Sequence, residues 1–124
     1  MKKHMLLLVL LILFGIFACI FFVIVANIYY PDIIVNPTSI VIDETTVTDT
    51  FIEIIGNITT VESLRVYKNY TYRIDQCSLY LTVYSGVDSS RKNSSFDVKI
   101  HGDFSEIKRL YIEGEEKQLL IWQK

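Results

Sequence analysis

The chain has 124 residues, of which 51% are hydrophobic, and its 12 basic and 14 acidic side chains give a formal net charge of −2 at pH 7. Residues 27–124 carry 10 basic and 14 acidic side chains, a formal charge of −4. A nucleic-acid-binding surface needs clustered positive charge, so nucleic acid is not an expected partner. Roughly 90 residues suffice for one modest hydrophobic core, so a single folded domain is expected after the first apolar segment.

That first segment is a candidate membrane anchor. Residues 5–26 form 22 consecutive positions without a charged side chain. A helix of that length is about 33 Å long, which matches a hydrocarbon core of about 30 Å. In lipid every backbone N–H and C=O must be bonded within the segment, and a helix satisfies that requirement. Residues 5–26 are therefore predicted to form a single-pass transmembrane helix, a signal anchor in contact with membrane lipid.

The flanking charges predict the orientation of this helix. Lys2 and Lys3 precede it, and the first charge after it is Asp32. Because basic residues favour the cytoplasmic side, residues 1–4 are expected to form a short cytoplasmic N-terminus. The extracytoplasmic domain, residues 33–124, is then expected outside the cell at the cell membrane.

Residues 27–32 are expected to link the helix to that domain at the membrane interface. Tyr29 and Tyr30 fit the aromatic belt found at membrane surfaces. Pro31 lacks a backbone N–H and is compatible with a helix that has already ended.

Two other interpretations of the N-terminus compete with the anchor. A secretory signal cleaved after Ala26 would have an overlong apolar region, with the bulky Ile24 at a position that prefers small side chains. Residues 16–19, Ile-Phe-Ala-Cys, resemble the lipobox of bacterial lipoproteins, in which the cysteine is lipidated. That resemblance implies lipidation at Cys19 and a bacterial source, although Phe17 is bulky for the motif and apolar residues follow it. The transmembrane anchor is favoured.

After Pro31 the sequence changes to short runs rich in Ile, Val, Tyr and Thr, which are typical of β-strands. Gly56-Asn57 is expected to form a two-residue hairpin turn. The serine-rich residues 86–95 are expected to form a solvated loop, and residues 114–117 the last turn. The strand-like runs are 33–42 (interrupted at Asn36-Pro37), 46–55, 58–61, 64–67, 70–74, 78–84, 96–101, 108–113 and 118–122.

The number and spacing of these strands predict the fold class. About seven or eight strands roughly ten residues apart, without a long amphipathic helix, indicate an antiparallel β-sandwich or a small barrel. Cys77 is the one cysteine outside the apolar segment, so no disulfide can form within the domain. The outer domain must therefore be stabilised by its core alone.

A possible catalytic or metal site centres on His101. His4 precedes the apolar segment, which leaves His101 as the histidine available on the outer side, near Asp97 and Asp103. Imidazole and carboxylates are suitable metal ligands and acid–base groups. Solvated polar residues on an alternating strand explain the same pattern and are favoured. The chain has no phosphate loop and no HExxH, CxxC or GxSxG motif, so no catalytic residue, metal or cofactor is predicted and the protein is not expected to be an enzyme.

Tyrosines are concentrated in the middle of the outer domain, where five fall within 18 residues: Tyr67, Tyr70, Tyr72, Tyr80 and Tyr84. Alternation in the strand at 78–84 places Leu79, Leu81 and Val83 on a buried face. Tyr80 and Tyr84 are then expected on the opposite, outward face, where tyrosine suits partner binding. Ordinary sheet tyrosines, covered on both faces, are the alternative.

The leading functional hypothesis is a membrane-tethered, non-enzymatic interaction module that binds an envelope or secreted protein through Tyr80 and Tyr84 or through a strand edge. One alternative is a small metal-binding or hydrolytic domain centred on His101. Another is a subunit of a membrane complex that is recognised through its helix.

Overall fold

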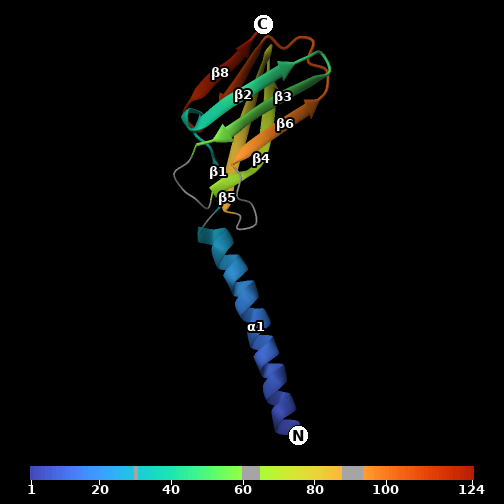
Figure 1. Ribbon diagram of the computed structural model, residues 1–124, viewed down its shortest axis with the longest axis vertical. Coiled ribbons are helices and arrows are strands. Elements are labelled where there is room, and N and C mark those ends of the chain that lie inside the picture. The colour runs from blue at the N-terminus through green and yellow to red at the C-terminus, as the bar shows by residue number, and fades with distance from the viewer. Residues whose placement is uncertain (30, 60–64, 88–93) are drawn as a thin grey trace. The chain divides into compact units, whose positions relative to one another are not determined.

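The computed structural model describes residues 1–29, 31–59, 65–87 and 94–124. It consists of two compact units, Met1–Pro31 and Asp32–Lys124. The first unit contains α1 (Lys2–Tyr29), the one α-helix of the described residues. The second unit contains strands β1 to β8 (Figure 1). Tyr30, which the sequence assigned to an aromatic belt, lies outside the described residues.

Helix α1 is apolar on all sides and 28 residues long, which corresponds to about 42 Å. Its segment Lys2–Ala26 is long and apolar enough to cross a membrane, by length and composition. The large apolar side chains between Met5 and Ile24 are exposed. Cys19 lies within the helix, which continues to Tyr29. The helix predicted at residues 5–26 is therefore present and extends three residues further at each end.

The second unit is a sandwich of two β-sheets, with the three-stranded sheet in front of the five-stranded sheet in Figure 1. The five-stranded sheet consists of β1 (Ile33–Ile34), β4 (Arg65–Asp75), β5 (Ser78–Val87), β7 (Arg109–Glu113) and β8 (Gln118–Gln123). The three-stranded sheet consists of β2 (Ile40–Val47), β3 (Phe51–Ile58) and β6 (Ser95–His101). A 3-10 turn, Pro37–Ser39, separates β1 from β2.

Strand β5 is the centre of the five-stranded sheet. Strand β4 pairs with it antiparallel along one edge. Its other edge is shared by β1, which is antiparallel, and β7, which is parallel. Strand β8 pairs with β7 and forms the far edge of the sheet. In the three-stranded sheet β3 is central and antiparallel to both β2 and β6.

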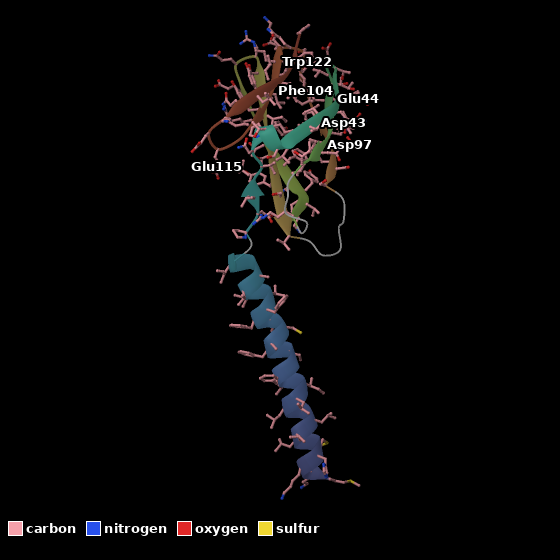
Figure 2. The ribbon with its side chains drawn as sticks, turned by 60° about the vertical axis from the view of Figure 1, so that its left-hand side comes forward. Asp43, Glu44, Asp97, Phe104, Glu115 and Trp122 are labelled. Carbon is pink, nitrogen blue, oxygen red and sulfur yellow. The ribbon has the colours of Figure 1, made fainter. Side chains whose placement is uncertain are left out.

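The core lies between the two sheets and follows the period-two alternation of the sequence. Strand β3 buries every second residue, and β6 does the same. Leu79, Leu81 and Val83 of β5 are 0% exposed, as the alternation predicted. Phe104, from the connection between β6 and β7, is buried, and Trp122 of β8 packs against the core at the same end of the domain (Figure 2).

The predicted fold class, an N-terminal apolar helix followed by a mainly-β domain, is confirmed, and the domain is a sandwich. One strand pair departs from the antiparallel expectation. Strands β5 and β7 are parallel because β6, which lies between them in sequence, belongs to the opposite sheet. A parallel pair needs such a crossover connection.

The hairpin predicted at Gly56-Asn57 is wrong. Strand β3 continues through both residues, and the chain turns earlier, where Thr48 N donates to Phe51 O at 2.9 Å. Gly56 has no positive φ. A Cβ atom at Gly56 would lie 2.6 Å from the Val41 carbonyl oxygen and 2.9 Å from Cζ of Phe96. The glycine therefore serves the close approach of neighbouring strands, one of the roles of glycine in strand interiors.

Two further expectations change in the structure. The strands expected at 64–67 and 70–74 are one strand, β4, with a β-bulge between Tyr67 and Asn69. The strand expected at 58–61 and the loop expected at 86–95 lie partly outside the described residues. The last hairpin, β7 to β8, forms as predicted, and Gly114 N donates to Lys117 O at 2.7 Å in its turn.

Candidate protein-interaction face

A row of four side chains crosses the outer face of the five-stranded sheet. The strand register places Arg73 opposite Tyr80, Tyr80 opposite Tyr111, and Tyr111 opposite Leu120. Residues directly opposite one another in adjacent strands share a face. Tyr80 lies between two buried leucines in β5, so this face points away from the core. We call Arg73, Tyr80, Tyr111 and Leu120 the outer row.

The side chains of the outer row are stacked. The rings of Tyr80 and Tyr111 are nearly parallel, with an interplanar angle of 10° and a centroid separation of 5.0 Å. On the other side of Tyr80, Cζ of Arg73 lies 4.0 Å from the ring centroid. Tyr80 is therefore enclosed between a guanidinium group and a second phenol ring, and stacking of this kind restricts both aromatic side chains.

Glu113 of β7 holds the arginine in this position. Arg73 Nε donates to Oε2 of Glu113 at 3.0 Å, and Nη2 donates to Oε1 at 2.8 Å. Gln118 Nε2 of β8 donates to the same Oε1 at 3.2 Å. Two parallel N–H to oxygen bonds fix the plane of a guanidinium group as well as its position. The network joins three strands, β4, β7 and β8.

The bonded pair remains charged over a wide pH range. The hydrogen bond from Arg73 lowers the pKa of Glu113, against partial burial that raises it. The hydrogen bond to Glu113 in turn raises the pKa of Arg73. Asp75 is a weaker neighbour, since its carboxylate lies 3.9 Å from Nη1 of Arg73. The outer row thus presents an ordered arginine whose positive charge is balanced locally.

Leu120 completes the outer row with an apolar side chain that is 44% exposed. Tyrosine, arginine and exposed aliphatic side chains on a rigid support form the kind of surface that proteins use to bind one another. The stacked rings and the bidentate ion pair order these side chains, and in protein interfaces such preorganisation lowers the entropic cost of binding.

Tyr84, the second tyrosine predicted to face outward, lies on the same side of β5 as Tyr80. It is half-buried and stands opposite Asn69 of β4 and Ile34 of β1. Four residues along a strand correspond to about 13 Å. Tyr84 is therefore placed beyond the stacked part of the outer row, and Tyr80 is the predicted residue that the structure joins to it.

The residues predicted for an alternative metal or acid–base site do not assemble. Asp97 and His101 lie four residues apart on β6, a separation of about 13 Å between their Cα atoms. Asp103 bonds to its own loop instead, because its Oδ1 accepts from the N–H and the hydroxyl of Ser105. These two bonds lower the pKa of Asp103. In the described part of the chain, no group of three His, Cys, Asp or Glu side chains could hold a metal ion.

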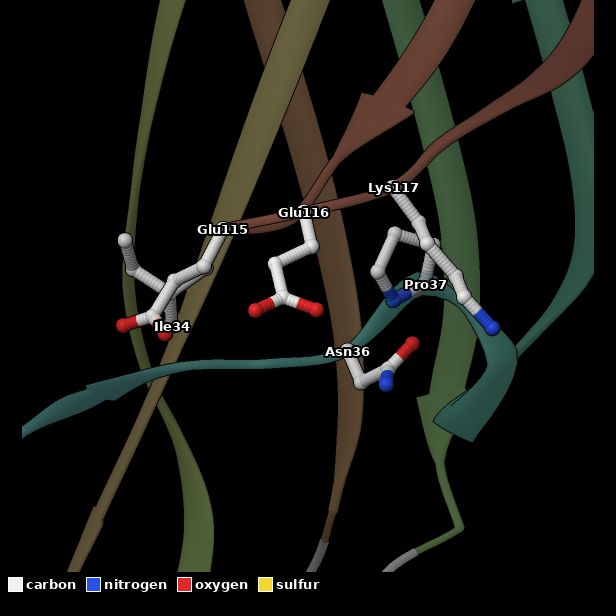
Figure 3. Close-up of a pocket in the computed structure, with 6 residues that line it drawn as sticks. All are labelled: Ile34, Asn36, Pro37, Glu115, Glu116 and Lys117. Atoms are coloured by element: carbon white, nitrogen blue, oxygen red, sulfur yellow. The ribbon is translucent and has the colours of Figure 1, made fainter.

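A cleft of about 300 Å³ lies between the turn that joins β7 to β8 and the segment that follows β1 (Figure 3). Its lining residues are Ile34, Asn36, Pro37, Glu115, Glu116 and Lys117. The Oδ1 atom of Asn36 already accepts from the N–H and hydroxyl of Thr38. Lys117 adds a positive charge to a lining that also holds two glutamates, so the cleft is a mixed-charge surface feature and gives no defined ligand set.

Sequence reasoning identified Tyr80 but missed Arg73, Tyr111, Glu113 and Leu120. Arg73 and Glu113 are 40 residues apart in the chain, and their contact depends on the parallel pairing of β5 with β7. The sequence pattern that bears on these residues is period-two alternation, which places each of them on the outward face of its own strand. No family model, curated protein or solved structure matches this chain, so its function is inferred from the geometry of its own residues.

Proposed function

We propose that this protein is a membrane-anchored, non-enzymatic interaction module that binds an envelope or secreted protein through the outer row. Residues 5–26 anchor the chain in the cell membrane, with the N-terminus in the cytoplasm and the β domain outside. Support for the anchor comes from the uninterrupted apolar helix α1, and support for the orientation comes from Lys2 and Lys3 before it. A bacterial source remains part of this proposal.

One observation carries the binding role: Arg73, Tyr80 and Tyr111 are stacked on an outward face, where Glu113 accepts two hydrogen bonds from Arg73. A solvated sheet face needs no such arrangement for stability, because exposed ion pairs contribute little to folding. Ordered tyrosine and arginine side chains are instead the residues that dominate binding energy in protein interfaces. Leu120 extends the surface with apolar area.

Position-specific photo-crosslinking in native membranes tests the binding role. A benzophenone amino acid replaces Leu120 in the outer row or, as the matched control, Val41 on the three-stranded sheet, which is 50% exposed. The expected result is one defined adduct from position 120 and none from position 41. Tyr111→Ala is expected to reduce that adduct about tenfold or more, because it removes half of the ring stack.

Two outcomes would contradict the binding role: equal adducts from both positions, or an adduct from position 120 that Tyr111→Ala leaves unchanged. Thermal unfolding of the full chain shows whether that variant is folded. The orientation is tested separately with Lys124→Cys and Lys3→Cys in intact cells, each in a background of Cys19→Ala and Cys77→Ala that removes the native thiols. A membrane-impermeant maleimide should label the first variant and not the second, and the reverse pattern would overturn the proposed topology.

A further inference from the structure

Among the described residues five strands lie at sheet edges: the two-residue β1 and the longer strands β2, β4, β6 and β8. Three of the four longer edge strands are irregular. The extra residue of a β-bulge lies on the edge strand itself in each case: Asp43 in β2, Lys68 in β4 and Ile121 in β8. Bulges at edge strands disrupt the ladder that another chain would need for pairing. Strand β6 differs, because it pairs with β3 over Ser95 to His101 without a register shift. In the described part of the chain, β6 is therefore the one edge strand longer than two residues that has no bulge.

The backbone of β6 offers hydrogen-bonding groups on its outer side. Gly102 N donates to Thr50 O at 3.0 Å, and Ile58 N donates to Ser94 O at 3.1 Å, one pair at each end of the β3–β6 ladder. Hydrogen-bonded pairs alternate along an antiparallel ladder. Even-numbered residues of β6 therefore bond to β3, and the N–H and C=O groups of Asp97 and Lys99 point away from it. No strand of the described residues pairs with that side.

We propose that a second copy of this chain pairs antiparallel with β6 along this edge, with the two-fold axis at Val98. In that register Asp97 faces Lys99 of the second copy, and Lys99 faces its Asp97. Both are residues whose backbone groups point outward, so each facing pair can exchange two backbone hydrogen bonds. The two three-stranded sheets then join into one continuous sheet.

The side chains of β6 are complementary to themselves in this register. Asp97 and Lys99 are exposed on the outer face, and opposite charges directly across a strand pair attract. Within the described residues the side chain of Asp97 forms no ion pair or hydrogen bond, and Figure 2 shows it on the same flank of the domain as the carboxylates of Asp43 and Glu44. On the inner face Phe96 would stand beside Ile100 of the second copy, so apolar residues face apolar ones.

The same side of the sandwich has apolar surface that no strand of the described residues covers. Strand β4 lies across from β6, and the ring of Tyr67 in β4 lies 5.6 Å from that of Phe96 in β6. Further along β4, Tyr72 and Ile74 stand opposite Leu81 and Leu79 and so share their inward face. The two leucines are 0% exposed, whereas Tyr72 is 44% and Ile74 is 49% exposed. A strand added beside β6 would extend the sheet that lies opposite this surface.

A charge-swap series on the full chain in detergent tests the proposal. The wild-type protein is expected to form a concentration-dependent dimer, measured by analytical ultracentrifugation. Asp97→Lys turns two attractive contacts into two repulsive ones and should raise the dimer Kd about 30-fold, since each cross-strand charge pair changes by about 1 kcal/mol. The double variant Asp97→Lys with Lys99→Asp restores opposite charges and should return the Kd to near its original value.

The matched control is Glu44→Lys, which makes the same charge change on the same face but at the opposite edge of the sheet, since Glu44 and Asp97 both pair with Ile55. This variant should dimerise like the wild type. A monomeric wild-type protein overturns the proposal, as does failure of the double swap to restore dimers or an equal loss in Glu44→Lys.

Disulfide trapping tests the register and excludes dimers formed by the helix alone. In a background of Cys19→Ala and Cys77→Ala, differently tagged chains carrying Asp97→Cys or Lys99→Cys are mixed and oxidised with diamide. A hydrogen-bonded pair has a Cα separation of about 5.5 Å, within the range for a disulfide. The mixture should therefore crosslink several-fold more than either variant alone. Equal crosslinking of the mixture and the single variants, or none, rejects pairing about Val98.

Discussion

The guanidinium carbon of Arg73 lies 4.0 Å from the centre of the Tyr80 ring, directly opposite it in the β4–β5 ladder. The arginine is held there from a third strand, because Glu113 of β7 accepts two of its N–H groups. The geometry of the Arg73–Tyr80 contact therefore depends on three strands of the sheet, β4, β5 and β7. It also gives the outer face of that sheet an ordered cation and a fixed aromatic ring.

Glu113→Gln should lower the stability of the domain at neutral pH by about 1 kcal/mol or less, because a partly exposed ion pair contributes little to folding. The hydrogen bond from Arg73 lowers the pKa of Glu113 from its ordinary value of 4.5, so the folded state favours the ionised carboxylate. That contribution is complete above pH 4.5 and is lost as the pH falls through the lower pKa of the folded protein. The stability difference between wild type and variant, measured by urea unfolding, should therefore shrink on acidification.

Glu115→Gln is the control for this pH series, because Glu115 lines the cleft next to the turn and forms no ion pair within the described residues. A difference between wild type and Glu113→Gln that stays constant from neutral to acidic pH would argue against an ionised Glu113 bound to Arg73.

Gly56→Ala should destabilise the β domain by about 1–3 kcal/mol, the usual cost of overpacking. The new methyl group would lie 2.6 Å from a backbone oxygen of Val41, which cannot move without breaking the β2–β3 ladder. Gly102→Ala is the matched control, because its nearest atoms belong to the Phe104 ring at 3.2 Å or more. Chemical unfolding of both variants measures the contrast, and equal losses would contradict the close approach at Gly56.

Gln76→Gly should stabilise the domain by about 1 kcal/mol, since a side chain in the left-handed region carries strain of that order. Gln76 lies between β4 and β5 and has a φ of 56°. Asparagine tolerates this conformation better than glutamine does. The stability of Gln76→Asn in thermal unfolding should therefore lie between that of the wild type and that of Gln76→Gly. A loss of stability in both variants would show that the glutamine side chain outweighs the backbone strain.

Ser85→Ala should leave stability unchanged or raise it by up to about 1 kcal/mol, because a buried hydroxyl without a partner is unfavourable. Ser85 is 1% exposed, and its Oγ has no hydrogen-bond partner in the described part of the protein. Thr48→Val provides the comparison, since the Thr48 hydroxyl donates to Phe51 O at 3.0 Å and accepts from Phe51 N at 3.0 Å. That variant should lose about 1 kcal/mol. Urea unfolding that shows Ser85→Ala to be the more damaging change would contradict this assignment.

Local sequence was enough to predict the two units and the phase of most strands. An apolar run as long as residues 5–26 has one stable backbone conformation in lipid, and period-two alternation identifies the buried face of a strand wherever that strand pairs. Leu79, Leu81 and Val83 are buried for that reason. Gly56 shows the limit of the method, because glycine has the same local signature in a turn and at a close approach between strands.

The sequence by itself determined the apolar helix, the β-rich domain and the side of β5 on which Tyr80 lies. The tertiary structure alone decided which strands are neighbours, and so brought Tyr111 and Glu113 of β7 to Tyr80 and Arg73. The physical reason is that alternation specifies the face of each residue but carries no information on strand order. Strand order depends on how all the strands bury their apolar faces together, which no local segment encodes.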